Sequence, residues 1–218
     1  MVGPVWITAE TQTAGRGRRG RVWDGGTGNL AATLLFRTDK APAEAAQISF
    51  VAALAVADLA KSLVDPALVR LKWPNDLLID GKKASGILVE SGLGPDGRLW
   101  LAVGIGVNLN SAPSDLERPA IALSAYSKGP IIPLAALDVL ARQFAHWQAR
   151  WERDGFSVIA DAWTLRAAGL GKVCEARLAD RSHYGIAEGL DPDGALRLRT
   201  PEGSVLRITA GDVFFGVA

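Results

Sequence analysis

The sequence predicts an α+β protein with a mixed, mainly antiparallel sheet packed on helices, followed by a small C-terminal β-barrel. Two long segments carry apolar residues at helical spacing, and several short β-rich segments follow one another with hairpin turn signals between them. From Gly171 onward only short strand-like runs occur. Helices combined with antiparallel strands favour this class over a doubly wound parallel sheet. We therefore expect one domain over residues 1–170 and a second over residues 171–218.

The first elements are a strand, a loop, a strand and a helix. Residues 5–10 are short and β-rich, and they enter a long segment of glycines and arginines. The apolar residues 29–37 are bounded by turn formers, which predicts a buried strand. In residues 42–64 a proline occupies the first turn and apolar residues recur every three to four positions. This spacing predicts a long helix with one apolar face.

The middle of the chain predicts three or four antiparallel strands. Residues 68–73 alternate, residues 86–90 are apolar, and residues 99–109 form an extended run. Asp80-Gly81 and Pro95-Asp96-Gly97 are hairpin turn signals between these runs.

The last third of the chain predicts two helices and then the barrel. Apolar residues at helical spacing begin near Pro133 and stop before Gly155, which predicts a second long helix. A shorter helix is expected over residues 156–167. After it, short strands are punctuated by Asp-Pro-Asp-Gly and Pro-Glu-Gly turns, as in small barrels.

Composition excludes several classes of protein. The 218 residues are 49% hydrophobic and 22% charged, which excludes disorder as the main state. The net charge of +1 gives no whole-surface attraction for nucleic acid or anionic lipid. A single cysteine, Cys174, excludes an internal disulfide and a cysteine metal cluster, and fits a reducing compartment. No signal peptide is readable, and the Ala-rich residues 45–57 fall short of the ~20 that a membrane span needs. We therefore expect a cytoplasmic protein without membrane contact.

The most unusual segment places four arginines and three glycines in residues 15–21. Glycines let the backbone approach a ligand closely, and guanidinium groups suit carboxylate or phosphate, so the segment is typical of an anion site. It also matches the glycine pattern of dinucleotide-binding folds, but no helix opens after it and no parallel βαβ alternation follows. An arginine-rich RNA-binding arm and a solvated flexible loop stay open at this point.

Three further segments carry polar residues where a ligand could lie. Residues 72–76 (KWPND) combine a lysine, a large apolar ring and two side chains able to bond a hydroxyl or an amine, and an ordinary turn with a packed tryptophan is the alternative. Lys83 precedes small residues, and Gly104 and Gly106 interrupt an apolar strand that ends at Asn108. These two glycines could instead relieve packing against the long helix. No P-loop, nucleophile elbow or histidine pair at metal spacing is present in the sequence.

Four segments together closely resemble the biotin protein ligase family, in order and in spacing. They are GRGRRGRVW (15–23), KWPND (72–76), GKKASGILVE (81–90) and GIGVNLN (104–110). The resemblance implies a class II synthetase-like catalytic domain and an SH3-like C-terminal domain. It also implies a short form without an N-terminal DNA-binding helix-turn-helix, so no binding to DNA is expected.

The family resemblance implies a reaction in two steps. The carboxylate of biotin attacks the α-phosphorus of ATP, which gives biotinyl-5′-AMP and pyrophosphate, and a lysine of a biotin carboxyl carrier protein then attacks the anhydride. Substrates would be biotin and ATP, with Mg²⁺ accompanying ATP. Fixed guanidinium groups and Mg²⁺ would offset the repulsion between carboxylate and triphosphate.

The resemblance also implies roles for individual residues. Catalytic roles fall on Arg18, Lys83 and Asp76, with Lys83 on the biotin carboxyl and phosphate and Asp76 close to the incoming lysine. Ligand contacts fall on these positions: Gln12, Gly15, Arg16, Gly17, Arg18, Trp23, Lys83, Gly86 and Asn108. No residue is expected to ligate a metal.

The sequence departs from the family pattern at its start. Members carry a further strand and helix with a Ser/Thr-Thr-Asn segment that bonds the biotin ring, whereas only eleven residues precede Gln12 here. A truncated chain and a biotin-binding remnant without catalysis therefore stay open. A lipoate or octanoate ligase or transferase, which shares the fold, is the nearest alternative enzyme. A free sheet edge could pair two protomers or a carrier domain.

Overall fold

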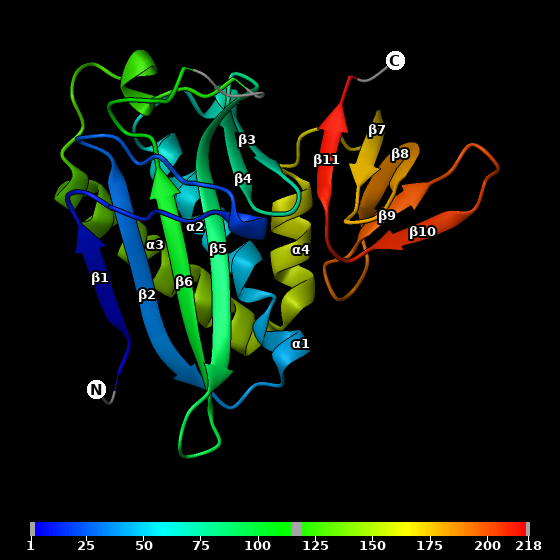
Figure 1. The fold of residues 1–218 in the computed structure, drawn as a ribbon, viewed down its shortest axis with the longest axis horizontal. Coiled ribbons are helices and arrows are strands. Elements are labelled where there is room, and N and C mark those ends of the chain that lie inside the picture. The colour runs from blue at the N-terminus through cyan, green and yellow to red at the C-terminus, as the bar shows by residue number, and fades with distance from the viewer. Residues whose placement is uncertain (1–2, 115–118, 217–218) are drawn as a thin grey trace.

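The computed structural model describes residues 3–114 and 119–216, and its larger sheet has six antiparallel strands (Figure 1). Their spatial order is β1-β2-β6-β5-β4-β3. The strands are β1 (Val5–Ala9), β2 (Leu30–Thr38), β3 (Val69–Lys72), β4 (Asp76–Ile79), β5 (Lys82–Leu93) and β6 (Leu99–Val107). The expected strands are thus confirmed. β4, which sequence patterning did not single out, is a short strand between the turn at 73–75 and the Asp80-Gly81 hairpin.

Helices cover one face of this sheet, behind the strands in Figure 1. They are α1 (Pro42–Ala45), α2 (Ile48–Lys61), α3 (Pro133–Asp154) and α4 (Phe156–Thr164). Helix α3 is amphipathic as expected, and it buries Leu140, Phe144, Trp147 and Trp151 at helical spacing.

Helix α2 differs from the expectation of one apolar face, because it is buried nearly all round. Its buried residues extend from Ile48 to Ala60 on every side, since the helix lies between the sheet and α3. The span Pro42–Lys61 is long and apolar enough to cross a membrane by composition alone, yet 67% of it is buried inside the domain. Here that composition serves the core of the fold.

The C-terminal residues form a second, five-stranded antiparallel sheet with the order β10-β9-β8-β7-β11. Its strands are β7 (Val173–Arg177), β8 (Ser182–Leu190), β9 (Leu196–Arg199), β10 (Val205–Ile208) and β11 (Asp212–Phe215). Cys174 is fully buried in this unit, and burial raises the pKa of its thiol to about 11.

The smaller sheet packs beside α4 and the β3–β4 turn (Figure 1). The indole Nε1 of Trp73 donates a hydrogen bond of 3.1 Å to the carbonyl oxygen of Gly194. Gly194 has a φ of +91°, and a Cβ there would lie 2.6 Å from the ring of Phe50 on α2. Trp73 is only 3% exposed, so it anchors the two units together instead of offering a free ring to a ligand. This corrects the expectation that its apolar face lines the site.

Candidate functional site

The segment from Gln12 to Trp23 crosses the sheet face opposite the helices (Figure 1). Two backbone contacts close it into a loop, because the N–H of Gly17 donates to Arg21 O at 2.7 Å and the N–H of Trp23 donates to Gly15 O at 2.9 Å. Arg19 and Gly20 adopt positive φ values of 56° and 71°. The left-handed turn at these positions reverses the chain and leaves the arginine side chains at the edge of a cavity.

The cavity floor is formed by glycines on the central strands. A Cβ at Gly106 would lie 2.4 Å from the indole ring of Trp23, and one at Gly86 would lie 3.1 Å from it. Gly104 also lines the cavity, and a Cβ there would make an ordinary van der Waals contact with the carbonyl oxygen of Leu88 at 3.4 Å. Between them, Ile105 is buried on the helix side of β6. The glycines therefore make room for Trp23 and for a ligand, and the alternative that they relieve packing against the long helix is wrong.

Lys83 and Asp76 meet at one end of the cavity. The Nζ of Lys83 lies 2.6 Å from Oδ1 of Asp76 and 5.7 Å from the centroid of the Trp23 ring. Asp76 is 7% exposed and pairs in register with Gly86 across β4 and β5. The lysine ammonium is thus fixed between a carboxylate and an aromatic face.

Arg18 lies beside this pair and is held from two directions. Its Nη1 donates to Oδ1 of Asn75 at 3.1 Å, and its Nη2 donates to the carbonyl oxygen of Gly211 at 3.0 Å. Asn75 is itself held by a bond from Nδ2 to Ile87 O at 2.6 Å. Burial lowers the pKa of Arg18, while the charges of Asp212 and Asp76 act in the opposite direction. The guanidinium stays charged, because even a lowered arginine pKa lies far above neutrality.

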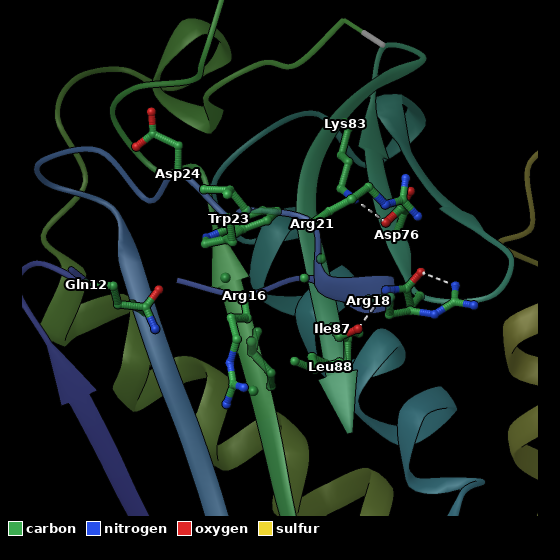
Figure 2. A pocket seen from close by; sticks show the side chains of 18 of the residues that line it. Gln12, Arg16, Arg18, Arg21, Trp23, Asp24, Asp76, Lys83, Ile87 and Leu88 are labelled. Atoms are coloured by element: carbon green, nitrogen blue, oxygen red, sulfur yellow. Dashed lines mark hydrogen bonds and ion pairs between the residues drawn. The ribbon is translucent and has the colours of Figure 1, made fainter. Parts of the chain in front are cut away.

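The whole site is a cavity of about 700 Å³, a size that suits a small organic ligand. Figure 2 shows Gln12 across the cavity from Lys83, Asp76 and Arg18, with Trp23 between them. The structure places these predicted residues together in the lining: Gln12, Arg16, Gly17, Arg18, Trp23, Asp76, Lys83, Gly86 and Asn108. Gly15 is not part of the lining. A Cβ there would lie 2.3 Å from Trp23 O, so this glycine serves loop closure.

Three buried polar atoms in the site make no hydrogen bond among the residues that the structure describes, although one of them, Oδ1 of Asp76, is ion-paired with Lys83 at 2.6 Å. The other two are Nε1 of Trp23, a donor, and Oδ1 of Asn108, an acceptor. Asn108 is only 2% exposed. Since buried polar groups are normally bonded, both atoms are available to a ligand with complementary polar groups.

Sequence reasoning missed Asn75 as a site residue and Asp212 altogether. Asn75 belongs to the KWPND segment, so its motif was a usable signal. Asp212 lies in the cavity lining, yet it comes from β11 in the smaller sheet. Nothing in the local pattern around it predicts that it meets the arginine loop.

No group of three or more histidine, cysteine, aspartate or glutamate side chains within residues 3–114 and 119–216 could hold a metal ion.

The strands and the loop that build the cavity match a class of protein ligases. Residues 3–110 match the biotin/lipoate A/B protein ligase family, and residues 169–216 match the biotin protein ligase C-terminal domain. The chain is 45% identical to a biotin–[acetyl-CoA-carboxylase] ligase of Paracoccus denitrificans, over 99% of this chain and 92% of the relative. This chain belongs to the biotin protein ligase family.

Other relatives agree with this membership. A bifunctional ligase/repressor BirA of Bacillus subtilis is 34% identical over 96% of this chain, and the chain spans 66% of that relative's length. Among solved structures, the biotin protein ligase from Aquifex aeolicus in complex with biotin and ATP matches with a TM-score of 0.81. It is 24% identical and the match covers 98% of this chain and 89% of that one, so it supports the fold.

Proposed function

We propose that this protein is an ATP-dependent ligase that activates biotin as biotinyl-5′-AMP and transfers it to a lysine of a biotin carboxyl carrier protein. The observation that carries the proposal is the convergence of Arg16, Arg18 and Lys83 on one cavity with a glycine floor. Together with Arg21, these cations line a cavity that also carries apolar residues such as Ile87 and Leu88, which suits a ligand with a hydrophobic body and an anionic end. The name of the Paracoccus relative supports the choice of biotin and of a carboxylase carrier.

In the first step an oxygen of the biotin carboxylate bonds to the α-phosphorus of ATP. The bond between that phosphorus and the bridging oxygen to the β-phosphate breaks, and pyrophosphate leaves with the electron pair. Arg18 and Lys83 hold the carboxylate and the phosphate side by side and offset their repulsion. Mg²⁺ enters with ATP and offsets further negative charge on the phosphates.

In the second step the amine of the carrier lysine attacks the acyl carbon of the anhydride. The bond to the phosphate oxygen breaks, AMP leaves, and the amine gives up a proton as the amide forms. Asp76 lies 2.6 Å from Lys83 Nζ at the same end of the cavity, where its carboxylate can orient the incoming amine and accept the proton that the amine gives up. Trp23 shields the reacting atoms from water.

We assign the remaining ligand contacts from the positions of the residues in the cavity. Gln12 lies at the far end of the cavity and would bond a polar group of the biotin ring. Gly17 and Gly86 let the backbone approach the ligand closely, and Gly15 acts indirectly by letting the loop close against Trp23. The free acceptor of Asn108 would take a donor from the nucleotide. We further propose a catalytic unit over residues 1–170 and an SH3-like unit over residues 171–218, working in the cytoplasm.

The most informative test incubates the purified protein with biotin, ATP, Mg²⁺ and a biotin carboxyl carrier domain. We expect a product that streptavidin detects, and none with a carrier whose target lysine is replaced by arginine. Titration calorimetry with biotin and lipoate separates the two enzyme classes, and we expect heat with biotin only. Binding of lipoate in place of biotin would overturn the proposal. Binding of biotin without any product would favour a remnant that has lost catalysis.

One sheet edge leaves the oligomeric state open to a further proposal. β1 is an outermost strand of the six-stranded sheet and exposes Ile7 to 51%, whereas the other outermost strand, β3, already bonds residues 166–168 through Leu71. Such an edge can pair with a strand of a second copy or of the carrier domain. Light scattering with and without carrier distinguishes a homodimer from a carrier complex.

A further inference from the structure

The carboxylate of Asp212 faces three arginines of the loop, although 191 positions separate it from Arg21 in the sequence. Its oxygens lie 2.6 Å from Arg21 Nη2, 3.6 Å from Arg19 Nη1 and 4.0 Å from Arg18 Nη1. The Asp212 side chain is 15% exposed. One partly buried carboxylate of the C-terminal unit therefore serves as shared counter-ion for three guanidinium groups of the catalytic unit.

The backbone around Asp212 is shaped to bring it to the loop. Gly211 has a φ of +148°, and a Cβ there would lie 2.9 Å from the carbonyl oxygen of Arg177. Only glycine fits this position, and its own carbonyl oxygen accepts the bond from Arg18. Asp212 pairs in register with Arg177, whose carbonyl oxygen accepts a long bond of 3.5 Å from Arg19. Strands β7 and β11 thus present three acceptors to the loop.

The loop needs such a partner, because its arginines repel one another. Like charges this close favour an open loop in water, and ions of the solvent screen them only in part. A carboxylate that is mostly buried is screened less, so it offsets more of the repulsion. Asn75 of the catalytic unit accepts a further hydrogen bond from Arg18 at 3.1 Å. Arg18 is thus oriented by groups of both structural units.

We propose that Asp212 is a positioning residue, which holds the arginine loop closed and sets the direction of the Arg18 guanidinium for the anionic ligand. The identity of that ligand rests on the proposed function, whereas the closed loop in the free protein does not. Asp212 offsets one positive charge of the three arginines and leaves the rest to attract a carboxylate or phosphate. The C-terminal unit therefore takes part in ligand retention without contacting the reacting atoms.

The first test measures the loop in the ligand-free protein by limited digestion with trypsin, which cleaves after arginine. Mass spectrometry reports cleavage within residues 16–21. We expect Asp212→Asn to raise this rate about tenfold, since the loss of a charge-assisted contact favours local opening. Asp212→Glu should restore most of the protection. Equal cleavage rates in wild type and Asp212→Asn would overturn the proposal.

Two controls keep this result specific. Asp193 is a carboxylate of the same unit that pairs with Arg207, so Asp193→Asn removes an equivalent charge away from the loop. We expect it to leave loop cleavage unchanged, and equal acceleration in both variants would contradict a local role. If Asp212→Asn does not fold, Arg21→Gln removes the shortest of the three contacts at a side chain that is 55% exposed. It should raise cleavage after Arg16 and Arg18, and no rise would overturn the proposal.

The second test measures retention of biotinyl-5′-AMP by the same variants. We expect Asp212→Asn to release the adenylate about tenfold faster, with a larger effect on KM for biotin than on kcat, and Asp212→Glu to recover it. Release at the wild-type rate would overturn the proposal. A wild type that forms no adenylate overturns the proposed function instead, and the trypsin result then decides this inference alone.

Discussion

The arginine loop and the KWPND turn reach the same cavity, but different forces hold them. The loop is exposed, glycine-rich, and tied by ion pairs, with Arg16 71% exposed and Arg21 55% exposed. The turn is buried, and Trp73 and Asp76 are 3% and 7% exposed. One segment is held mainly by charge and the other by packing.

This difference gives the two segments different roles in ligand binding. Charge contacts between exposed groups are weak and reversible, so a loop held by them can open to admit a ligand and close around it. Buried packing resists displacement, so a turn held by it keeps its polar groups at fixed positions. The comparison predicts that changes in the turn lower stability, whereas changes in the loop mainly alter ligand handling.

The largest effect is expected from Trp73→Ala. It removes a buried ring and the hydrogen bond to Gly194, so the free energy of unfolding should fall by about 3–5 kcal/mol. Urea denaturation followed by circular dichroism measures it. Trp100→Ala is the matched control, because the Trp100 ring covers Gly92 on the outer sheet face, and about 1 kcal/mol is expected there. Equal losses in both variants would contradict an anchoring role for Trp73.

The next effect concerns Lys83, whose ammonium is held by Asp76 of the KWPND turn. Lys83→Ala should lower the rate of adenylate formation by about 10²–10³-fold, since it removes a charge aimed at the reacting phosphate. It also leaves the Asp76 carboxylate, which is 8% exposed, without the ion pair at 2.6 Å. Pyrophosphate release in a single turnover measures the rate. A loss below about threefold would remove Lys83 from the catalytic group.

A smaller effect is expected where the end of the arginine loop packs on the sheet. Gly106→Ala places a Cβ 2.4 Å from the Trp23 ring and must displace it, so adenylate formation should fall by about 10–10²-fold. Gly129→Ala is a suitable control, because nothing lies within 4 Å of its Cβ. If Gly106→Ala is as active as that control, Trp23 does not depend on the glycine floor.

The last prediction concerns the core of the C-terminal unit, away from the site. Because burial raises the pKa of Cys174 to about 11 from 9.0, the folded protein keeps this thiol protonated at pH 8. Labelling by a disulfide reagent should be about hundredfold slower than in urea, and the labelling rate should rise as the pH approaches 11. Rapid labelling of the native protein would show that this core opens readily.

Local pattern was enough to predict most elements, because strands and amphipathic helices leave their period in the sequence. Helix α3 and strand β2 follow their predicted spans within a few residues. Helix α2 did not follow the one-face pattern, because α3 covers the side that would otherwise face water. β4 was missed because a strand of four residues carries too little alternation to be recognised.

The site was predictable where its residues share a motif. Arg18, Lys83 and Asn108 lie in segments whose family resemblance named them, and the structure brings them to one cavity. Asp212 was not predictable, because its partners come from the other end of the chain and its own neighbours carry no signal. The contact partner of the Trp73 ring was also not predictable, since an indole beside polar residues suits a ligand and a domain contact equally well.

The account depends most on the claim that the arginine loop holds the acyl-adenylate by charge. Biotin-dependent exchange of pyrophosphate into ATP tests it directly. Wild type and Arg18→Ala are compared after urea denaturation has shown that their free energies of unfolding are equal. We expect exchange in the wild type, a clear fall in Arg18→Ala, and faster loss of bound adenylate from the variant. Unchanged exchange and unchanged retention in Arg18→Ala would contradict the account.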